Sequence, residues 1–260
     1  MSARLKKHFG QHFLHDRDVL DRIVLAIAPQ HGQLLVEIGP GAGALTLPLL
    51  DAIARLTAIE LDRDLHQPLR ERAARHGQLD LIEANVLDVD FSVLARELGG
   101  QLRLVGNLPY YLSSPILFHC LGHRGAISDM TFLLQKEVVD RVVAIPGNKT
   151  YGRLSVMLQL ACHAESLFEV PPDAFTPAPK VNSALLRLTP HPQHEQPDID
   201  PGALQDIVRM AFGKRRKTLA NALKGVLSAD QIRTVGIDPG VRAETLEPDA
   251  FVKLARVMTR

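Results

Sequence analysis

Cysteine is scarce in this sequence: Cys120 and Cys162 are the only two among 260 residues. They stand apart without the spacing of metal ligands, and the eleven histidines form neither an HExxH nor a CxxC…H pattern. A disulfide framework and a metal site are therefore not expected. Isolated cysteines of this kind are typical of a reduced, cytoplasmic protein.

Long apolar runs are lacking as well. No stretch approaches the roughly 20 apolar residues that a helix needs to span a bilayer. The opening MSARLKKHFGQHFL has no long apolar core and no small-residue cleavage site, so neither membrane association nor a secretory signal is expected. Hydrophobic residues make up 46% and charged residues 23% of the chain, which indicates an ordinary globular protein with one large core, or with one large and one small domain.

The chain has no overall excess of one charge, because its formal net charge is only +1. The charges are unevenly distributed, however. Residues 1–17 carry four Lys/Arg against one Asp, and residues 201–260 carry eleven Lys/Arg against six Asp/Glu, so the segment between them is acidic. Basic ends on an acidic body are compatible with a polyanionic partner, and equally with solvated helix faces.

Short apolar runs alternate with amphipathic segments along the first 190 residues. Five runs predict buried strands, at 34–39, 56–61, 79–84, 102–107 and 129–135, and helices are expected at 18–28, 63–75 and 115–121. This alternation predicts βαβ units with a parallel sheet covered on both faces, so the fold class is α/β. Two later runs, at 165–170 and 183–190, are joined by a proline-rich connection and are expected to add antiparallel strands at the sheet edge.

The rest of the chain predicts a second domain. The segment 191–200 is rich in proline and polar residues and is expected to be a linker. Beyond it, helices are predicted at 203–212, 218–227, 230–235 and 248–258. The prediction is therefore an α/β domain at 1–190, a linker at 191–200 and a small all-helical domain at 201–260.

A glycine-rich loop follows the first predicted strand. Gly39, Gly41 and Gly43 let the backbone turn sharply and let a ligand approach the main chain, and the following helix presents free N–H groups. Glu60 ends the second predicted strand, where a nucleotide-binding fold places the acid that binds ribose. Loop and acid together predict a nucleoside cofactor, although Gly39-x-Gly41-x-x-Ala44 also fits the looser dinucleotide fingerprint.

Two polar residues favour one cofactor. Glu37 stands two residues before the first glycine, where it would repel the phosphates of a dinucleotide but would suit the cationic S-adenosyl-L-methionine. Asn85 follows the third predicted strand and is placed to bond the adenine amine of such a cofactor. An ordinary turn residue is the alternative for Asn85.

The fourth predicted strand ends in Asn107-Leu108-Pro109-Tyr110, at the edge where open parallel sheets bind ligands. Methyl transfer to the exocyclic amine of a base is helped by two acceptors for its N–H groups, because they free a lone pair that is delocalised into the ring. The Asn107 side-chain oxygen and the Leu108 carbonyl, held extended by the following proline, are the predicted acceptors. Tyr110 offers a stacking face to a base turned out of its strand. A chance Asn-x-Pro-Tyr turn is the alternative.

These motifs and others along nearly the whole chain resemble those of the ribosomal RNA adenine dimethyltransferases. The segments that carry the resemblance are FGQHFL (9–14), VEIGPGAGALT (36–46), AIELDRDL (58–65), GNLPYYLSSP (106–115), LLQKEVVDR (133–141), YGRLSVM (151–157) and VPPDAFTPAPKVNS (170–183). The resemblance implies a Rossmann-like class I methyltransferase sheet with a small helical C-terminal domain. It also implies transfer of methyl groups from S-adenosyl-L-methionine to N6 of two adjacent adenosines in the 3′-terminal hairpin of 16S rRNA. The implied partner is 16S rRNA within the small ribosomal subunit during its biogenesis, and a monomer is expected.

The resemblance also assigns residues to the site. The expected cofactor contacts, with the two loop residues proposed above, are His12, Leu14, Glu37, Gly39, Gly41, Glu60, Asn85 and Asn107. Tyr110 and Phe175 would position the target adenine, and Phe175 lies between prolines on a loop that is expected to be stiff; a plain core aromatic is the alternative. The family usually has asparagine where His12 stands and aspartate where Asn85 stands. The neutral amide at position 85 predicts modestly weaker cofactor binding than aspartate would give.

Basic residues are the expected RNA contacts. They are Arg4, Lys6, Lys7, Lys214, Arg215, Arg216 and Lys217. The run at 214–217 is predicted to begin the second helix of the small domain, where the helix dipole disfavours cations. That cost favours phosphate binding over a solvated helix start, and contacts of this kind hold a backbone without reading its sequence.

Three other functions stay open at this point. An NAD-dependent dehydrogenase accounts for the glycine fingerprint but not for Asn107 and Tyr110. A non-catalytic RNA-binding assembly factor on the same fold has no need of Glu60, Asn107 and Tyr110. A DNA adenine methyltransferase can carry a similar Asn-Pro-Pro-Tyr motif, but Leu108 and the whole-chain resemblance favour RNA.

Overall fold

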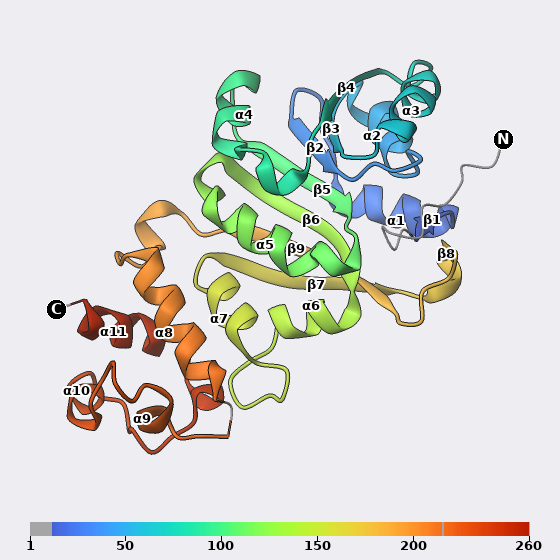
Figure 1. The fold of residues 1–260 in the computed structure, drawn as a ribbon. Helices are drawn as coiled ribbons and strands as arrows, with labels where there is room; N and C mark the ends of the chain where they lie inside the picture. The colour runs from blue at the N-terminus through green and yellow to red at the C-terminus, as the bar shows by residue number, and fades with distance from the viewer. Residues whose placement is uncertain (1–11, 215, 260) are drawn as a thin grey trace. The chain divides into compact units, whose positions relative to one another are not determined.

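The computed structural model describes residues 12–214 and 216–259, and the chain divides into two compact units (Figure 1). The first unit takes in the chain up to Val139 and then Glu165–Pro190, and the second comprises Asp140–Ala164 and His191–Arg260. The second unit therefore includes the stretch 140–164, which the sequence assigned to the first domain. The predicted linker at 191–200 belongs to the second unit and contains a short 3₁₀ turn.

A seven-stranded sheet runs through the first unit in the order β4-β3-β2-β5-β6-β9-β7. Its strands are β2 (Leu34–Ile38), β3 (Arg55–Glu60), β4 (Gln78–Glu83), β5 (Leu102–Asn107), β6 (Ile127–Gln135), β7 (Cys162–Val170) and β9 (Ser183–Pro190). The first five in chain order are parallel, and β9 pairs antiparallel with β6. The predicted α/β class and the late antiparallel strand are confirmed.

Helices connect these strands and lie on both faces of the sheet (Figure 1). They are α1 (Arg17–Ile27), α2 (Thr46–Ile53), α3 (His66–Ala73), α4 (Phe91–Leu98), α5 (Ser113–Gly122) and α6 (Lys136–Val142). Strands of a parallel sheet are buried on both faces, which explains why β2 reads LLVEI with four of its five residues buried. On one face, Ile23 of α1 and Leu49 of α2 share a core with Val105 of β5.

A second, two-stranded sheet joins distant parts of the first unit. Its strands are β1 (Phe13–Leu14) and β8 (Phe175–Thr176), which pair antiparallel with Phe13 opposite Thr176 and Leu14 opposite Phe175. Neither strand is predicted by the sequence, because two residues carry too little periodicity to indicate a strand. This small sheet fixes the segment that leads into α1.

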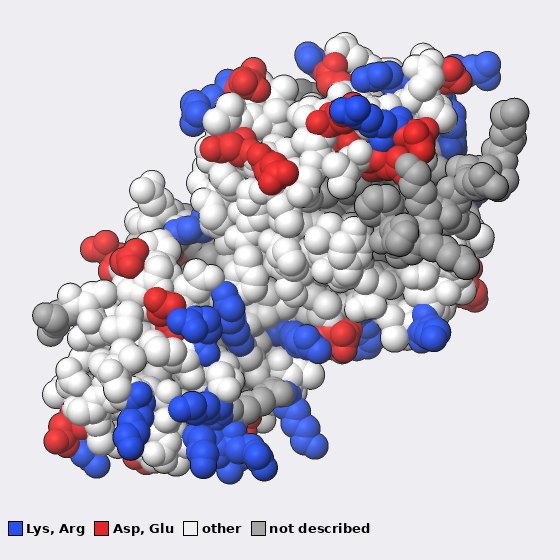
Figure 2. Space-filling view, viewed as in Figure 1, with Lys and Arg blue, Asp and Glu red and all other residues white. Residues whose placement is uncertain are grey.

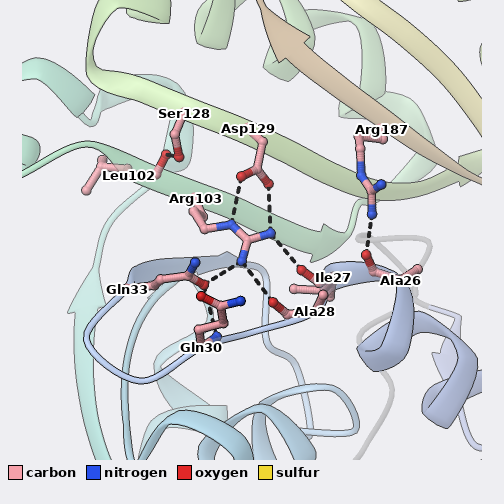
Figure 3. Close-up of polar contacts among 10 residues, drawn as sticks. All are labelled: Ala26, Ile27, Ala28, Gln30, Gln33, Leu102, Arg103, Ser128, Asp129 and Arg187. Atoms are coloured by element: carbon pink, nitrogen blue, oxygen red, sulfur yellow. Dashed lines mark hydrogen bonds and ion pairs between the residues drawn. The ribbon is translucent and has the colours of Figure 1, made fainter.

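Arg103 of β5 connects the C-terminal end of α1 to the sheet (Figure 3). Its guanidinium forms a bidentate ion pair with the Asp129 carboxylate of β6, with N–O distances of 2.7 and 3.3 Å. The same group donates to the carbonyls of Ile27 and Ala28, at 2.6 and 3.4 Å, and so satisfies acceptors that the helix end leaves open. Arg187 of β9 donates to the carbonyl of Ala26. Helix α1 is therefore held at one end by these two arginines.

The second unit is helical and has its own core. Its helices are α7 (Arg153–Gln159), α8 (Pro201–Gly213), α9 (Leu219–Ala222), α10 (Ala229–Thr234) and α11 (Pro248–Met258). Tyr151 and Val156 pack into one cluster with Ile207 of α8 and Phe251 of α11, which is why residues 140–164 fold with the C-terminal helices. The buried Tyr151 hydroxyl donates to the Leu246 carbonyl at 2.8 Å.

The predicted helix at 218–227 is mostly wrong. Only residues 219–222 are helical, because Leu223 caps α9 and Gly225 follows with φ of 93°. The basic run does not start this helix either, since it lies in the connection between Gly213, which ends α8, and Thr218, which caps α9. None of the helices among the described residues is long and apolar enough to cross a membrane.

Candidate active site

A pocket lies where the parallel strands of the first unit end. It is formed by the segments after β2, β3, β4 and β5 together with β1. Its empty volume is about 1240 Å³, which includes space that is open to solvent. It brings together His12, Leu14, Glu37, Gly39, Gly41, Glu60, Asn85, Asn107, Leu108 and Tyr110.

The glycine loop forms the floor of the pocket at the end of β2. Gly39 has φ of 68° and donates its N–H to the Ile59 carbonyl at 2.9 Å, which ties the loop to β3. Gly41 also has a positive φ, and a Cβ atom there would lie 3.3 Å from the Phe13 ring. Glycine at position 41 therefore lets β1 pack directly on the loop. A side chain at this position would strain the backbone and push Phe13 away.

Glu60 fixes the loop from the end of β3. The residue is 7% exposed, and its two side-chain oxygens accept from the backbone N–H groups of Gly41 at 3.2 Å and Asp62 at 2.8 Å. His66 donates from Nε2 to the Glu60 carbonyl at 3.0 Å. The carboxylate is thus oriented at the edge of the pocket, where it can accept hydrogen bonds from hydroxyl groups of a bound ribose.

Glu37 is the most buried acidic residue of the pocket, because the residue is only 2% exposed. Thr46 Oγ1 donates to its Oε2 at 2.7 Å. Burial raises the pKa of Glu37 to about 7; the Thr46 hydrogen bond opposes this rise, and the negative charge of Glu60 adds to it. A buried carboxylate without a cation beside it is costly, so this site favours a positively charged ligand.

Asn85 lines the pocket at the end of β4. Its Oδ1 accepts from the Leu87 N–H at 3.2 Å and caps the short 3₁₀ turn η3 (Val86–Asp88). The turn-residue interpretation is therefore correct for the side-chain oxygen, and the residue also faces the pocket. The two roles are compatible, because an amide oxygen has two acceptor positions and the amide nitrogen is a separate donor.

Asn107 at the end of β5 connects the pocket to the chain before α1. Its Nδ2 donates to the His12 carbonyl at 3.1 Å. His12 in turn donates from Nδ1 to the Pro177 carbonyl at 2.7 Å, and its ring lies 5.3 Å from the Tyr110 ring at an interplanar angle of 31°. Because the Asn107 nitrogen is engaged, its side-chain oxygen is the atom left to meet a donor in the pocket.

The residues after Asn107 are held by the neighbouring strands. Leu108 is 1% exposed and donates its N–H to the Leu133 carbonyl of β6 at 3.1 Å. Pro109 is extended, with φ of −62° and ψ of 129°. The Tyr110 hydroxyl shares a hydrogen bond of 2.8 Å with Ser183 Oγ, and burial raises the pKa of Tyr110 despite that bond. The Tyr110 ring is therefore fixed at its far end, as a stacking surface needs to be.

Phe175 does not line this pocket. The residue is 2% exposed and belongs to the core that includes Leu14, Leu45 and Ala174. In this conformation it supports the pocket from behind, through the pairing of Leu14 with Phe175. Its contact with a target base stays a prediction.

None of the expected RNA-contacting residues that the structure describes lines the pocket. Arg4, Lys6, Lys7 and Arg215 lie outside the described residues, whereas Lys214, Arg216 and Lys217 are exposed on the second unit. Figure 2 shows Lys and Arg side chains gathered over the lower part of the view, where Figure 1 places α9 and the connection from α8. The run follows the C-terminus of α8, where the helix dipole favours cations. The predicted electrostatic cost is therefore wrong, and it no longer argues for phosphate binding.

Three residues that sequence analysis did not assign take part in the site. Phe13 packs on the glycine loop, Thr46 binds Glu37, and Ser183 binds Tyr110. Thr46 lies at the start of α2, directly after the glycine loop, so its position in the sequence is enough to suggest a role in the site. Phe13 and Ser183 reach the site through strand pairings over long sequence distances, which a single sequence does not reveal.

The pocket fits S-adenosylmethionine and not a dinucleotide. The buried Glu37 carboxylate would face a cation but would repel a pyrophosphate, and Glu60 and Asn85 offer partners for an adenosine. Asn107 stands at the end of β5, on the other side of β2 from these residues, where an amine could be held. Fold and pocket together define a class I methyltransferase that uses S-adenosylmethionine.

Comparison with known proteins gives the family. The sequence model described as "Ribosomal RNA adenine dimethylase" matches residues 2–260. The chain is 54% identical to the "Ribosomal RNA small subunit methyltransferase A" of Nitrosococcus oceani, over 98% of this chain and 97% of that one. It is 55% identical to the protein of the same name from Xylella fastidiosa, strain 9a5c, over 98% and 96% of the two chains.

Solved structures show the same fold. A dimethyladenosine transferase from Plasmodium falciparum superposes with a TM-score of 0.78 at 23% identity, covering 94% of this chain and 96% of that one. The 23S rRNA methyltransferase ErmE superposes with a TM-score of 0.71 at 24% identity, covering 95% and 100%. The chain belongs to the ribosomal RNA adenine dimethylase family, and it is a methyltransferase that acts on adenine in ribosomal RNA with S-adenosylmethionine as cofactor.

Proposed function

We propose that this enzyme methylates N6 of two adjacent adenosines in the 3′-terminal hairpin of 16S rRNA, within the small ribosomal subunit, to give N6,N6-dimethyladenosines. The small-subunit assignment is supported by the names of relatives that are 54–55% identical over nearly the full chain. The observation that carries the chemistry is the orientation of Asn107. Its nitrogen donates to the His12 carbonyl, so its oxygen is directed to an incoming amine.

Two acceptors would hold the adenine amine. The Asn107 oxygen takes one N–H and the Leu108 carbonyl takes the other, which favours pyramidal geometry at N6 and localises its lone pair. Tyr110 supports the base by stacking, with its hydroxyl anchored on Ser183. Correct alignment of the nucleophile is the main contribution that these residues make to the rate.

No strong general base is required. The amine becomes much more acidic as it gains a methyl group, so its proton can pass to an acceptor of ordinary strength. The Asn107 oxygen and the Leu108 carbonyl already hold the N–H groups, and water can take the proton as the product leaves. The Tyr110 hydroxyl is not suited to act as a base, because burial raises its pKa.

The cofactor would be held by the residues around the glycine loop. Gly39 and Gly41 would let it lie against the backbone, Glu60 would bind the ribose hydroxyls, and Asn85 the adenine. Glu37 would offset its positive charge, and His12, Leu14 and Asn107 would close the pocket over its methionine part. Bound S-adenosylmethionine supplies an electrophilic methyl group on a sulfonium.

We assign catalysis to the first unit and contact with the RNA backbone to basic residues outside the pocket. Lys214, Arg216 and Lys217 are exposed, and charge of this sign attracts phosphates without reading sequence. Arg4, Lys6, Lys7 and Arg215 are proposed to join them, and Phe175 to support the target base. We further propose that the enzyme acts as a monomer in the cytoplasm, where ribosomal subunits are assembled.

Small subunits from cells that lack this activity test the proposal. We expect the purified enzyme and S-adenosylmethionine to produce N6,N6-dimethyladenosine at two adjacent positions near the 3′ end, as mapped by mass spectrometry of nuclease fragments. Asn107→Ala should largely abolish the product, and Asn221→Ala, which removes an exposed amide of the second unit, should not. Binding to subunits without any methylation would instead support a non-catalytic assembly factor.

A further inference from the structure

The tyrosine that follows Tyr110 is in an unusual position. Tyr111 is 57% exposed, yet it is one of the residues that line the pocket. A single exposed aromatic is common on protein surfaces and needs no explanation by itself. At the mouth of a pocket that receives a base, however, the same ring presents an uncovered stacking surface.

The local backbone explains why the two tyrosines face different ways. Residues 110–112 form the 3₁₀ turn η4, in which successive side chains are about 120° apart because the turn has three residues. Tyr110 is directed inwards, since its hydroxyl binds Ser183, which is fully buried. Tyr111 is therefore rotated away from the interior and stands at the rim.

The turn also holds Tyr111 rigidly. Pro109 precedes it, the Leu112 N–H donates to the Pro109 carbonyl at 3.0 Å, and the Ser113 N–H donates to the Tyr110 carbonyl as α5 begins. A ring on such a fixed backbone loses little conformational entropy when it binds a partner. The exposed surface is thus prepared for contact.

We propose that Tyr111 stacks on the base next to the target adenosine, an inference that rests on the proposed function. When one base is turned into the pocket, its neighbour in the strand loses a stacking partner and is left at the pocket mouth. Tyr111 replaces that partner from the rim while Tyr110 supports the extruded base inside. Stacking of a base on an aromatic ring contributes about 1–3 kcal/mol, or roughly 5- to 150-fold in affinity.

Tyr111 therefore contributes to the binding and the selection of the substrate strand. Because the two target adenosines are adjacent in the proposed substrate, one of the two neighbours of each target is the other adenine. Purines stack more extensively than pyrimidines, so a rim aromatic at this point favours a second adenine beside the first.

A double-mutant cycle between protein and RNA tests this role. Small subunits are reconstituted with 16S rRNA whose 3′ segment carries either both target adenosines or one adenosine beside an abasic residue. Single-turnover methylation of the remaining adenosine is measured with the unaltered enzyme and with Tyr111→Ala, together with the KM for S-adenosylmethionine.

We expect the abasic residue to lower kcat/KM for RNA about tenfold with the unaltered enzyme. Tyr111→Ala should cause a similar loss on intact RNA, and the abasic residue should then cause no further loss. Tyr111→Phe should stay within about threefold of the unaltered enzyme because it keeps the ring. The KM for the cofactor should not change in either variant, and Leu25→Ala, which removes an exposed apolar side chain of α1 away from the pocket, should have no effect.

Two results would overturn the role of Tyr111. One is full activity of Tyr111→Ala on intact RNA, and the other is an abasic penalty that is equal in the unaltered enzyme and in Tyr111→Ala. Both outcomes leave methylation by the unaltered enzyme intact. Absence of methylation by the unaltered enzyme would instead reject the proposed function, and the role of Tyr111 with it.

Discussion

The side-chain nitrogen of Asn107 donates a hydrogen bond to the backbone carbonyl of His12, a residue 95 positions earlier in the chain. This bond gives the amide two functions. Its nitrogen fastens the segment before β1 over the pocket, and its oxygen is left to accept from the target amine.

Substitution can separate these two functions. Asn107→Asp keeps an acceptor but replaces the donor by an oxygen, which would repel the His12 carbonyl, whereas Asn107→Ala removes both groups. We expect the single-turnover methylation rate to fall about tenfold in Asn107→Asp and at least a hundredfold in Asn107→Ala, since loss of a positioning hydrogen bond costs about 1–3 kcal/mol. Equal rates in Asn107→Asp and the unaltered enzyme would show that the bond to His12 is dispensable.

Asn85→Asp is expected to bind S-adenosylmethionine about fivefold more tightly than the unaltered enzyme. Aspartate caps the 3₁₀ turn η3 as well as asparagine does, and a charged acceptor forms a stronger hydrogen bond to an adenine amine. Isothermal titration calorimetry measures the difference. Asn85→Ala is the matched control and should bind more weakly, and unchanged or weaker affinity in Asn85→Asp would contradict the prediction.

Glu37 makes the stability of the first unit depend on pH. The pKa of its carboxyl is about 7 in the folded protein, against 4.5 for an exposed glutamate. Between these values the folded protein keeps a proton that the unfolded chain has lost, so stability falls as pH rises from about 4.5 to 7 and this contribution is constant above that. A shift of this size corresponds to roughly 3 kcal/mol.

Glu37→Gln removes this contribution. Relative to the unaltered protein, the variant should gain about 3 kcal/mol of unfolding free energy between pH 4.5 and pH 7.5, as measured by urea unfolding without cofactor. The comparison cancels the other titrating groups, which both proteins share. A difference in stability that is independent of pH would show that Glu37 is ionised throughout this range. The same variant should bind the cationic cofactor more weakly at pH 8.

Arg103 is expected to be worth far more to stability than a surface arginine. Arg103 and Asp129 are 13% and 19% exposed, and Arg103→Met would leave the Asp129 carboxylate and two α1 carbonyls without their donor (Figure 3). We expect a loss of about 3 kcal/mol in unfolding free energy. Arg55→Met breaks the exposed pair with Asp80, where the side chains are 64% and 37% exposed, and should cost under about 1 kcal/mol. Equal losses in the two variants would contradict this difference.

Sequence alone predicts the central sheet well. The runs at 34–39 and 102–107 coincide with β2 and β5 to within a residue, because strands buried on both faces are continuous apolar segments that end at polar or glycine residues. Asn107 and Glu60 were found for the same reason, since the ends of parallel strands meet at one edge of a sheet. Position along the chain therefore predicted which polar groups face the pocket.

Other features depend on contacts that a single sequence does not contain. The bonds from Tyr110 to Ser183 and from Asn107 to His12 join residues 73 and 95 positions apart. Phe175 shows the same limit, because the sequence left both a stacking role and a plain core aromatic open, and only the packing places this residue in the core. The end of α8, in contrast, depends on a local feature of the sequence. Gly213 is the last residue of α8, and a glycine at that point indicates that the helix ends before the basic run.

The pairing of β1 with β8 has a consequence for the order in which the molecule is made. Phe13 lies opposite Thr176, so one wall of the pocket requires a segment synthesised more than half a chain later. Strands β2 to β6 can associate as they emerge, but β1 has no strand to pair with until β8 has left the ribosome. A nascent chain that already holds the glycine loop and Asn107 should therefore bind the cofactor less tightly than the complete chain. This wall of the pocket is completed only late in translation, on the same kind of particle whose RNA the enzyme modifies.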